Sequence, residues 1–114
     1  MELKLDVMVM SGVDDGLLLN FSTVNADGKL SDNRWVLSIG RREDSDICLR
    51  NDTYVSRQHA FIQWEQDRWW LEDSKSRNGT YMEAIDGDAI VSGIVPLNPG
   101  QLFRVGRTWL RIQE

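Results

Sequence analysis

Three short polar clusters carry the side chains of this chain that could bind an anion. They are Gly40-Arg41, the run from Ser56 to His59, and the run from Ser74 to Thr80. Together they supply guanidinium groups, hydroxyls, a side-chain amide and, at tight turns, backbone N–H groups. A phosphorylated side chain carries about −1.5 to −2 charges and three acceptor oxygens. These clusters therefore contain the groups that a bound phosphate needs.

Each candidate side chain suits a different part of such a ligand. Arg41 follows a glycine at the end of a predicted strand, and its planar fork matches two phosphate oxygens better than a lysine would. Ser56 is a compact donor in a loop. Asn78 precedes Gly79 in a predicted tight turn, and its amide both donates and accepts. Asn78 could therefore pair with the backbone of an extended peptide.

Each of these residues alone also has an ordinary structural explanation. A single arginine such as Arg41 is most often a solvated surface residue, and Ser56 could cap a turn. Asn78-Gly79 is a common turn pair, and His59 fits a hydrogen-bonded structural histidine better than an acid–base group. The set as a whole, and not any one member, favours binding.

The clusters lie at the ends of segments in which apolar and polar residues alternate, the period expected of strands. No window has the apolar spacing of a helix, and turn signals recur along the chain, which predicts an all-β sandwich. We expect a loop over residues 29–34 and core positions for Trp35, Trp64, Trp69 and Trp109. The predicted strands cover residues 3–9, 17–21, 35–39, 47–49, 60–64, 69–73, 102–105 and 109–112.

Composition narrows the class of protein. A chain of 114 residues with 41% apolar residues predicts one globular domain. The net charge of −5 argues against a nucleic-acid partner, because such proteins pair many phosphates with cations. No stretch approaches the roughly 20 apolar residues of a membrane helix, so no membrane partner is expected. A single cysteine, Cys48, favours a reducing compartment and hence a cytoplasmic location.

The ordered set Gly40-Arg41, Ser56-Arg57-x-His59 and Ser76-x-Asn78-Gly79-Thr80 resembles the signature of the forkhead-associated (FHA) domain. A predicted hairpin over residues 60–73 and a closing segment around residues 97–106 strengthen the resemblance, which covers nearly the whole chain. It implies an eleven-stranded β-sandwich of two antiparallel or mixed sheets, with binding loops at one end. Residues 1–114 would form a single FHA domain, which could be one module of a longer protein.

The resemblance also implies a function. FHA domains bind phosphothreonine-containing proteins or peptides and act as non-catalytic adaptors in signalling that depends on Ser/Thr kinases. Arg41 and Ser56 match the positions that contact phosphate, and Arg57 stands beside them. Asn78 matches the asparagine that holds the peptide main chain. The structural positions of the motif are Gly40, His59 and Gly79.

Two positions depart from the family pattern. Arg77 stands where some members carry a small hydroxyl residue that touches the peptide, so its guanidinium could add a contact. Glu83 stands where many members have a second asparagine, in a loop to about Asp88 that is longer and more acidic than usual. This loop helps to choose the residue three places after the phosphothreonine in the family. The flanking preference is therefore open.

Other function classes have less support. With one histidine, a Ser-His-Asp hydrolase would need His59 with Ser56 or Ser74 and with Asp73, and no Gly-x-Ser-x-Gly motif is present. Acidic pairs such as Asp44-x-Asp46 match no metal-ligand spacing. We therefore expect no catalytic residue, no metal and no cofactor. The alternative that remains is an interaction domain on the same sandwich that binds independently of phosphorylation.

Overall fold

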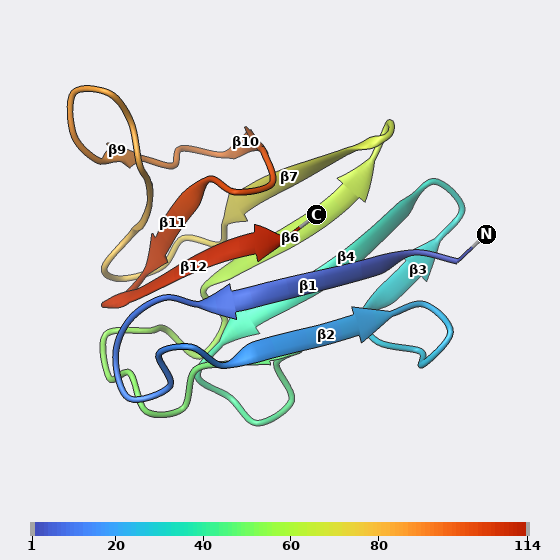
Figure 1. Ribbon diagram of the computed structural model, residues 1–114, viewed down its shortest axis with the longest axis horizontal. Helices are drawn as coiled ribbons and strands as arrows, with labels where there is room; N and C mark the ends of the chain where they lie inside the picture. The colour runs from blue at the N-terminus through green and yellow to red at the C-terminus, as the bar shows by residue number, and fades with distance from the viewer. Residues whose placement is uncertain (1, 114) are drawn as a thin grey trace.

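The computed structural model describes residues 2–113, which fold into two stacked β-sheets of six strands each (Figure 1). The first sheet has the order β2-β1-β12-β11-β8-β9. Its strands are β1 (Lys4–Val9), β2 (Leu18–Ser22), β8 (Thr80–Met82), β9 (Ala89–Ile90), β11 (Leu102–Val105) and β12 (Thr108–Gln113). All of its pairings are antiparallel.

The second sheet has the order β10-β7-β6-β4-β3, and a short strand, β5, pairs in parallel with β4 at its end. Its strands are β3 (Lys29–Ser31), β4 (Arg34–Gly40), β5 (Ile47–Cys48), β6 (Ala60–Glu65), β7 (Arg68–Asp73) and β10 (Ile94–Leu97). The expected sandwich of antiparallel and mixed sheets is therefore confirmed.

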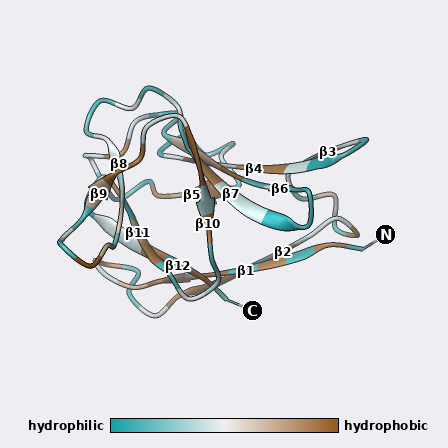
Figure 2. Cartoon of the chain, turned by 90° about the horizontal axis from the view of Figure 1, so that it is seen from above, coloured by the Kyte–Doolittle hydropathy of each residue, from teal (hydrophilic) through white to brown (hydrophobic). Residues whose placement is uncertain are grey.

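The core lies between the sheets and consists of the side chains that the period-two pattern turns inward. In β1 every second residue is buried, and in β4 the same alternation buries Trp35, Leu37 and Ile39. Figure 2 shows the two layers edge-on, with apolar segments in the strands of both. Burial of these apolar side chains is the main force that holds the layers together.

Several strands differ from the expectation. The structure has twelve strands instead of eleven, the segment expected as a loop contains β3, and no strand was predicted at β8, β9 or β10. The three residues of β3 are all exposed, and the strand forms through backbone pairing with β4. No apolar alternation marks such a strand in the sequence. Within residues 2–113 no helix has the length and apolar character needed to cross a bilayer.

The tryptophan prediction was right for three of the four residues. Trp35 is fully buried, and Trp64 and Trp69 pack against the core beside it. Trp109 was wrongly expected in the core. In β12 the side chains of Thr108 and Leu110 are buried, so strand alternation turns Trp109 to the outer face, where its ring lies 5.7 Å from the guanidinium carbon of Arg104.

The register of the second sheet brings three distant segments to one edge. Ile39 pairs with Ala60, and Ala60 pairs with Asp73. Because both pairings are antiparallel, the end of β4, the start of β6 and the end of β7 lie side by side. Backbone hydrogen bonds continue the ladder past the strands, from His59 N to Ile39 O at 2.9 Å and from Ser74 N to His59 O at 2.8 Å.

Candidate anion-binding site

The loops that leave this edge surround a hollow of about 370 Å³, which we call the arginine hollow. Its walls come from the residue after β4, from the β5–β6 loop and from the β7–β8 loop. All five residues predicted to contact a phosphopeptide line it, together with four residues that were not predicted. The complete lining is Arg41, Thr53, Tyr54, Val55, Ser56, Arg57, Gln58, Arg77 and Asn78.

Arg41 is fixed at the edge of the hollow by two hydrogen bonds. Its backbone N–H donates to the Ser56 carbonyl at 3.1 Å, and its Nε donates to the Val55 carbonyl at 3.1 Å. The terminal nitrogens of the guanidinium have no hydrogen-bond or ion-pair partner in the described part of the chain. The side chain is exposed, so its two-pronged end is free to bind an anion.

Ser56 joins two walls of the hollow. Its hydroxyl oxygen accepts a hydrogen bond from the backbone N–H of Arg77 at 3.1 Å. This bond uses the oxygen as an acceptor and leaves the hydroxyl hydrogen free to donate. Ser56 therefore positions the β7–β8 loop and still offers a donor to a ligand.

Asn78 bridges the same loops on the other side. Its Nδ2 donates to the Tyr54 carbonyl at 2.9 Å. Its Oδ1 accepts no hydrogen bond from residues 2–113, and the side chain is exposed. Since an amide nitrogen carries two hydrogens, one donor and the acceptor oxygen are left for the main chain of a ligand.

His59 holds the two loops together from beneath. It is fully buried, its Nδ1 accepts the Ser56 N–H at 2.9 Å, and its Nε2 lies 2.9 Å from the Gly79 carbonyl. Because Nδ1 accepts, the proton must sit on Nε2, which donates to Gly79. Burial lowers the pKa of His59 below its ordinary value of 6.5, although the Gly79 hydrogen bond and the Asp73 and Asp52 carboxylates oppose this shift. The ring is therefore neutral and structural.

The sequence analysis named Asp73, Ser76 and Thr80 but did not predict the hydrogen bonds by which they shape the β7–β8 turn. The carboxylate of Asp73 accepts hydrogen bonds from the hydroxyls of Ser76 and Thr80 and from the Ser76 N–H. The Ser76 oxygen in turn accepts from the Gly79 N–H at 3.0 Å, and Gly79 has a φ of +84° that favours glycine. The run of small hydroxyl residues three and seven places after an aspartate was the available signal.

The charge around the hollow differs from that of the whole chain. Arg41, Arg57 and Arg77 line it, all three are exposed, and no carboxylate lies in its wall. The chain as a whole carries a net charge of −5. A phosphate at this position would therefore meet a local positive potential, because more distant acidic residues are screened by salt over about 8–10 Å.

The same contacts argue against a hydrolase. His59 bonds the backbone N–H of Ser56 and not its hydroxyl, so the histidine cannot activate Ser56 as a nucleophile. Among residues 2–113 no group of three or more potential ligands could hold a metal ion. Glu83, the second position that departs from the FHA pattern, lies outside the arginine hollow. Its carboxylate accepts a hydrogen bond from the Leu102 N–H at 3.0 Å.

A larger hollow, of about 570 Å³, lies at the opposite end of the sandwich. It opens between the β3–β4 turn and the β6–β7 turn, and it includes Trp35 and Trp64. One cation, Arg34, lines it together with Asp32, Glu65 and Asp67. Since acidic side chains outnumber cations there, this end is the poorer place for a phosphate.

Comparison with protein families identifies an FHA domain over residues 37–106, more than half of the chain. The matched segment starts within β4 and ends at Gly106, after β11. It therefore contains every predicted site residue.

Curated relatives come from mycobacteria. The chain is 34% identical to the FHA domain-containing protein FhaB of Mycobacterium tuberculosis over 79% of this chain and 58% of the relative. It is 37% identical to the glycogen accumulation regulator GarA of the same species over 60% of this chain and 43% of the relative. The chain thus spans about half the length of these relatives.

Solved FHA domains have the same architecture. An FHA domain studied for its phosphothreonine-dependent interactions superimposes with a TM-score of 0.72 and 25% identity, over 98% of this chain and 97% of the other. The FHA domain of FhaA, solved in complex with the intracellular domain of another protein, has a TM-score of 0.67 and 25% identity, over 96% of this chain and 99% of the other. The FHA domain of CT664 from Chlamydia trachomatis matches with a TM-score of 0.75 and 23% identity, over 98% of both chains, and bears on the fold alone.

Proposed function

The chain belongs to the FHA domain family, and we propose on this basis that it binds phosphothreonine-containing proteins or peptides as an adaptor in Ser/Thr-kinase signalling. The observation that carries the proposal is the arginine hollow. Arg41, Ser56 and Asn78 are far apart in the sequence but line one hollow, and each has a hydrogen-bonding group that no residue of 2–113 uses.

The mechanism is recognition without chemistry. The free end of the Arg41 guanidinium and the Ser56 hydroxyl bind the phosphate oxygens, and Arg57 and Arg77 add positive charge. The Asn78 amide pairs with the peptide main chain beside the phosphothreonine, and it is held in place by its bond to the Tyr54 carbonyl. Gly40, His59 and Gly79 position these loops and do not contact the ligand.

The proposal has three corollaries. The chain has no catalytic activity and needs no metal or cofactor. It acts in the cytoplasm, where kinases phosphorylate their substrates and where a single cysteine such as Cys48 stays reduced. Residues 1–114 act as one domain, because the buried apolar residues form a single core cluster.

The direct test is a titration with matched peptides. One contains phosphothreonine, the second contains threonine at the same position, and the third contains phosphoserine. Isothermal titration calorimetry should detect binding of the phosphothreonine peptide and little or none of its unphosphorylated twin. Equal affinity for the phosphorylated and unphosphorylated peptides would instead support an interaction domain that ignores phosphorylation.

A further inference from the structure

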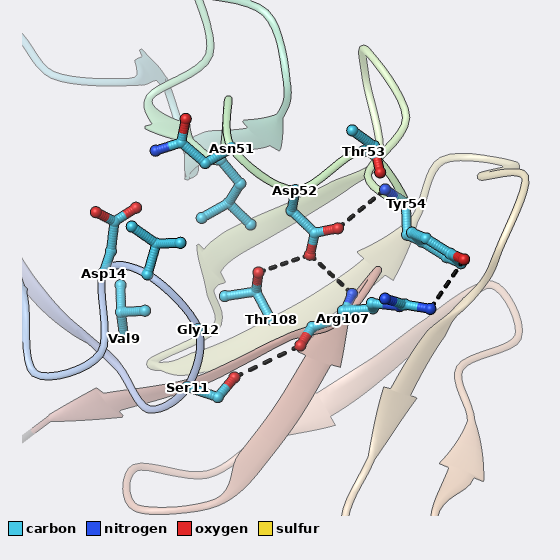
Figure 3. Close-up of a pocket in the computed structure, with 12 residues that line it drawn as sticks. Val9, Ser11, Gly12, Asp14, Asn51, Asp52, Thr53, Tyr54, Arg107 and Thr108 are labelled. Atoms are coloured by element: carbon cyan, nitrogen blue, oxygen red, sulfur yellow. Dashed lines mark hydrogen bonds between the residues drawn. The ribbon is translucent and has the colours of Figure 1, made fainter.

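A third hollow, of about 180 Å³, is shown in Figure 3. It adjoins the arginine hollow and shares Thr53 and Tyr54 with it. Its walls come from the β1–β2 loop, the β5–β6 loop and the β11–β12 turn. We call it the Arg107 hollow, after the one cation that lines it. Neither the predicted site nor the phosphate contacts account for it.

Arg107 is held in place at both its backbone and its side chain. Its backbone N–H donates to the Asp52 carboxylate at 2.8 Å, and its guanidinium carbon lies 3.8 Å from the centroid of the Tyr54 ring. One terminal nitrogen also donates to the Tyr54 hydroxyl at 2.9 Å. Figure 3 shows this arrangement, with the guanidinium beside the tyrosine. A cation fixed in this way loses little entropy when it binds an anion.

The charge of Arg107 is not neutralised within the described residues. The ion pairs there involve Lys4, Arg42 and Arg50, and Arg107 is exposed. The nearby Asp52 carboxylate is already occupied by three donors, which are two backbone N–H groups and the Thr108 hydroxyl. The other carboxylate of the hollow, Asp14, lies on its far side in Figure 3.

Tyr54 connects the two hollows physically. Its backbone carbonyl accepts the Asn78 amide, and its side chain carries Arg107. A peptide held by Asn78 must therefore lie against the Tyr54 segment, and a residue flanking the phosphothreonine comes next to Arg107. We propose that Arg107 binds an aspartate or glutamate side chain of the same phosphopeptide, and this inference rests on the proposed function.

The geometry favours a carboxylate over other side chains. One face of the guanidinium covers the Tyr54 ring, so this ring face is closed to an apolar side chain. The edge of the guanidinium, which carries the N–H donors, matches the two oxygens of a carboxylate. A second phosphate fits less well, because the hollow has one cation and two carboxylates, Asp14 and Asp52.

The test is a set of phosphothreonine peptides in which each flanking position in turn is alanine, aspartate, lysine or phosphoserine. At one position we expect aspartate to bind about tenfold more tightly than alanine, the value of one charge-assisted hydrogen bond. Arg107→Ala should abolish this preference and keep the dependence on phosphothreonine. Arg107→Glu should transfer the preference to lysine at the same position.

The control is Arg50→Ala. Arg50 is an exposed arginine on the β5–β6 loop that pairs with Glu43, so the variant loses the same charge at another place. It should retain the preference for aspartate. If phosphothreonine binding occurs with no acidic preference, or if the preference persists in Arg107→Ala, the inference fails while the proposed function stands. If the peptide with phosphoserine at that position binds more tightly than the one with aspartate, the ligand of Arg107 is a phosphate and not a carboxylate, and the inference is wrong. If no peptide binds in a phosphate-dependent way, the proposed function itself fails.

Discussion

At the scale of single residues, the site side chains each do two tasks. Arg41, Ser56 and Asn78 use one hydrogen-bonding group to fix a loop and leave another unused within residues 2–113, which the proposed function assigns to the ligand. This division means that removing a side chain affects both the loop and the ligand. A conservative substitution that keeps the loop contact separates the two effects.

Arg41 provides the sharpest residue-scale prediction. Arg41→Ala should weaken binding of a phosphothreonine peptide by more than about 100-fold, because two charge-assisted hydrogen bonds are worth about 1.5–3 kcal/mol each. Arg41→Lys keeps the charge but loses the forked guanidinium, so its affinity for the peptide should lie between that of the wild type and that of Arg41→Ala. Calorimetry measures both variants, and circular dichroism confirms that they fold. Wild-type affinity in a folded Arg41→Ala protein would remove Arg41 from the site.

His59 predicts a dependence of stability on pH. Its folded pKa is lowered below 6.5, so the unfolded chain binds the proton more readily than the folded one. The contribution of neutral His59 is therefore fully present above pH 6.5 and is lost as the pH falls through the folded pKa. Protonation of Nδ1 would also place two donors, His59 and the Ser56 N–H, against each other.

Urea unfolding of the wild-type protein and of His59→Gln checks this prediction. The free energy of unfolding of the wild type should fall more steeply between about pH 7 and pH 5 than that of the variant, because only the wild type has an imidazole, whose ordinary pKa lies in this range. Parallel pH profiles for the two proteins would show that His59 carries no proton linkage.

At the scale of elements, the antiparallel register of β4, β6 and β7 builds the rim. Gly40 ends β4 where the β5–β6 loop crosses closely over it. A Cβ atom at Gly40 would lie 2.1 Å from the Arg57 carbonyl oxygen and 2.8 Å from the Ser45 hydroxyl. The first contact is with backbone, so the loop itself would have to move. The glycine is required here by close approach and not by its φ.

Gly40→Ala should therefore damage stability and binding together. We expect a loss of about 1–3 kcal/mol in the free energy of unfolding, the usual cost of overpacking, and a displaced Arg57 segment. The matched control is Gly93→Ala, where a Cβ meets nothing within 4 Å and the strain comes from a φ of +70° alone. This control should keep full affinity for the phosphopeptide. If Gly40→Ala were as stable as the wild type and bound the phosphopeptide as tightly, the Arg57 backbone would not lie close to Gly40.

At the scale of the whole molecule, the core lies apart from the arginine hollow, where the proposed function places recognition. The described chain measures 36 × 30 × 26 Å, with the core between the sheets and the loops of the arginine hollow at one end. The arginines of the site gather at this end of an otherwise acidic protein. Changes in the distant core should therefore alter the free energy of unfolding without altering the affinity of the folded protein.

Ile112→Ala tests this separation. Ile112 is fully buried in β12, opposite Val7, and its truncation should cost about 2–5 kcal/mol. Calorimetry below the unfolding temperature should give wild-type affinity for the phosphothreonine peptide. A saturating phosphopeptide should raise the melting temperature of both proteins, because it binds only the folded state. A change in affinity beyond a few-fold would reveal coupling between the core and the rim.

The local pattern of the sequence was enough to predict most strands and the inward residues of the core, because alternation along a strand depends only on neighbouring positions. The spacing of Arg41, Ser56, His59 and Asn78 was enough to identify the family. The pattern predicted no strand at β3, β8, β9 or β10, and it failed at Trp109. In β3 all three residues are exposed, and Leu30 alone is apolar, so no alternation marks the strand. At Trp109 the prediction failed because Thr108 and Leu110, and not Trp109, face the core.

The tertiary structure alone decided which loops meet and what each side chain has left to offer. Pairing between strands sets the register, and it places Arg41 beside Val55 and Asn78 beside Tyr54. Arg107 had no signal in the sequence, since its partner Tyr54 lies 53 positions away and no local rule links a turn arginine to a distant tyrosine. Contacts of this kind arise from the packing of whole loops, so they become visible only once the sheets are assembled.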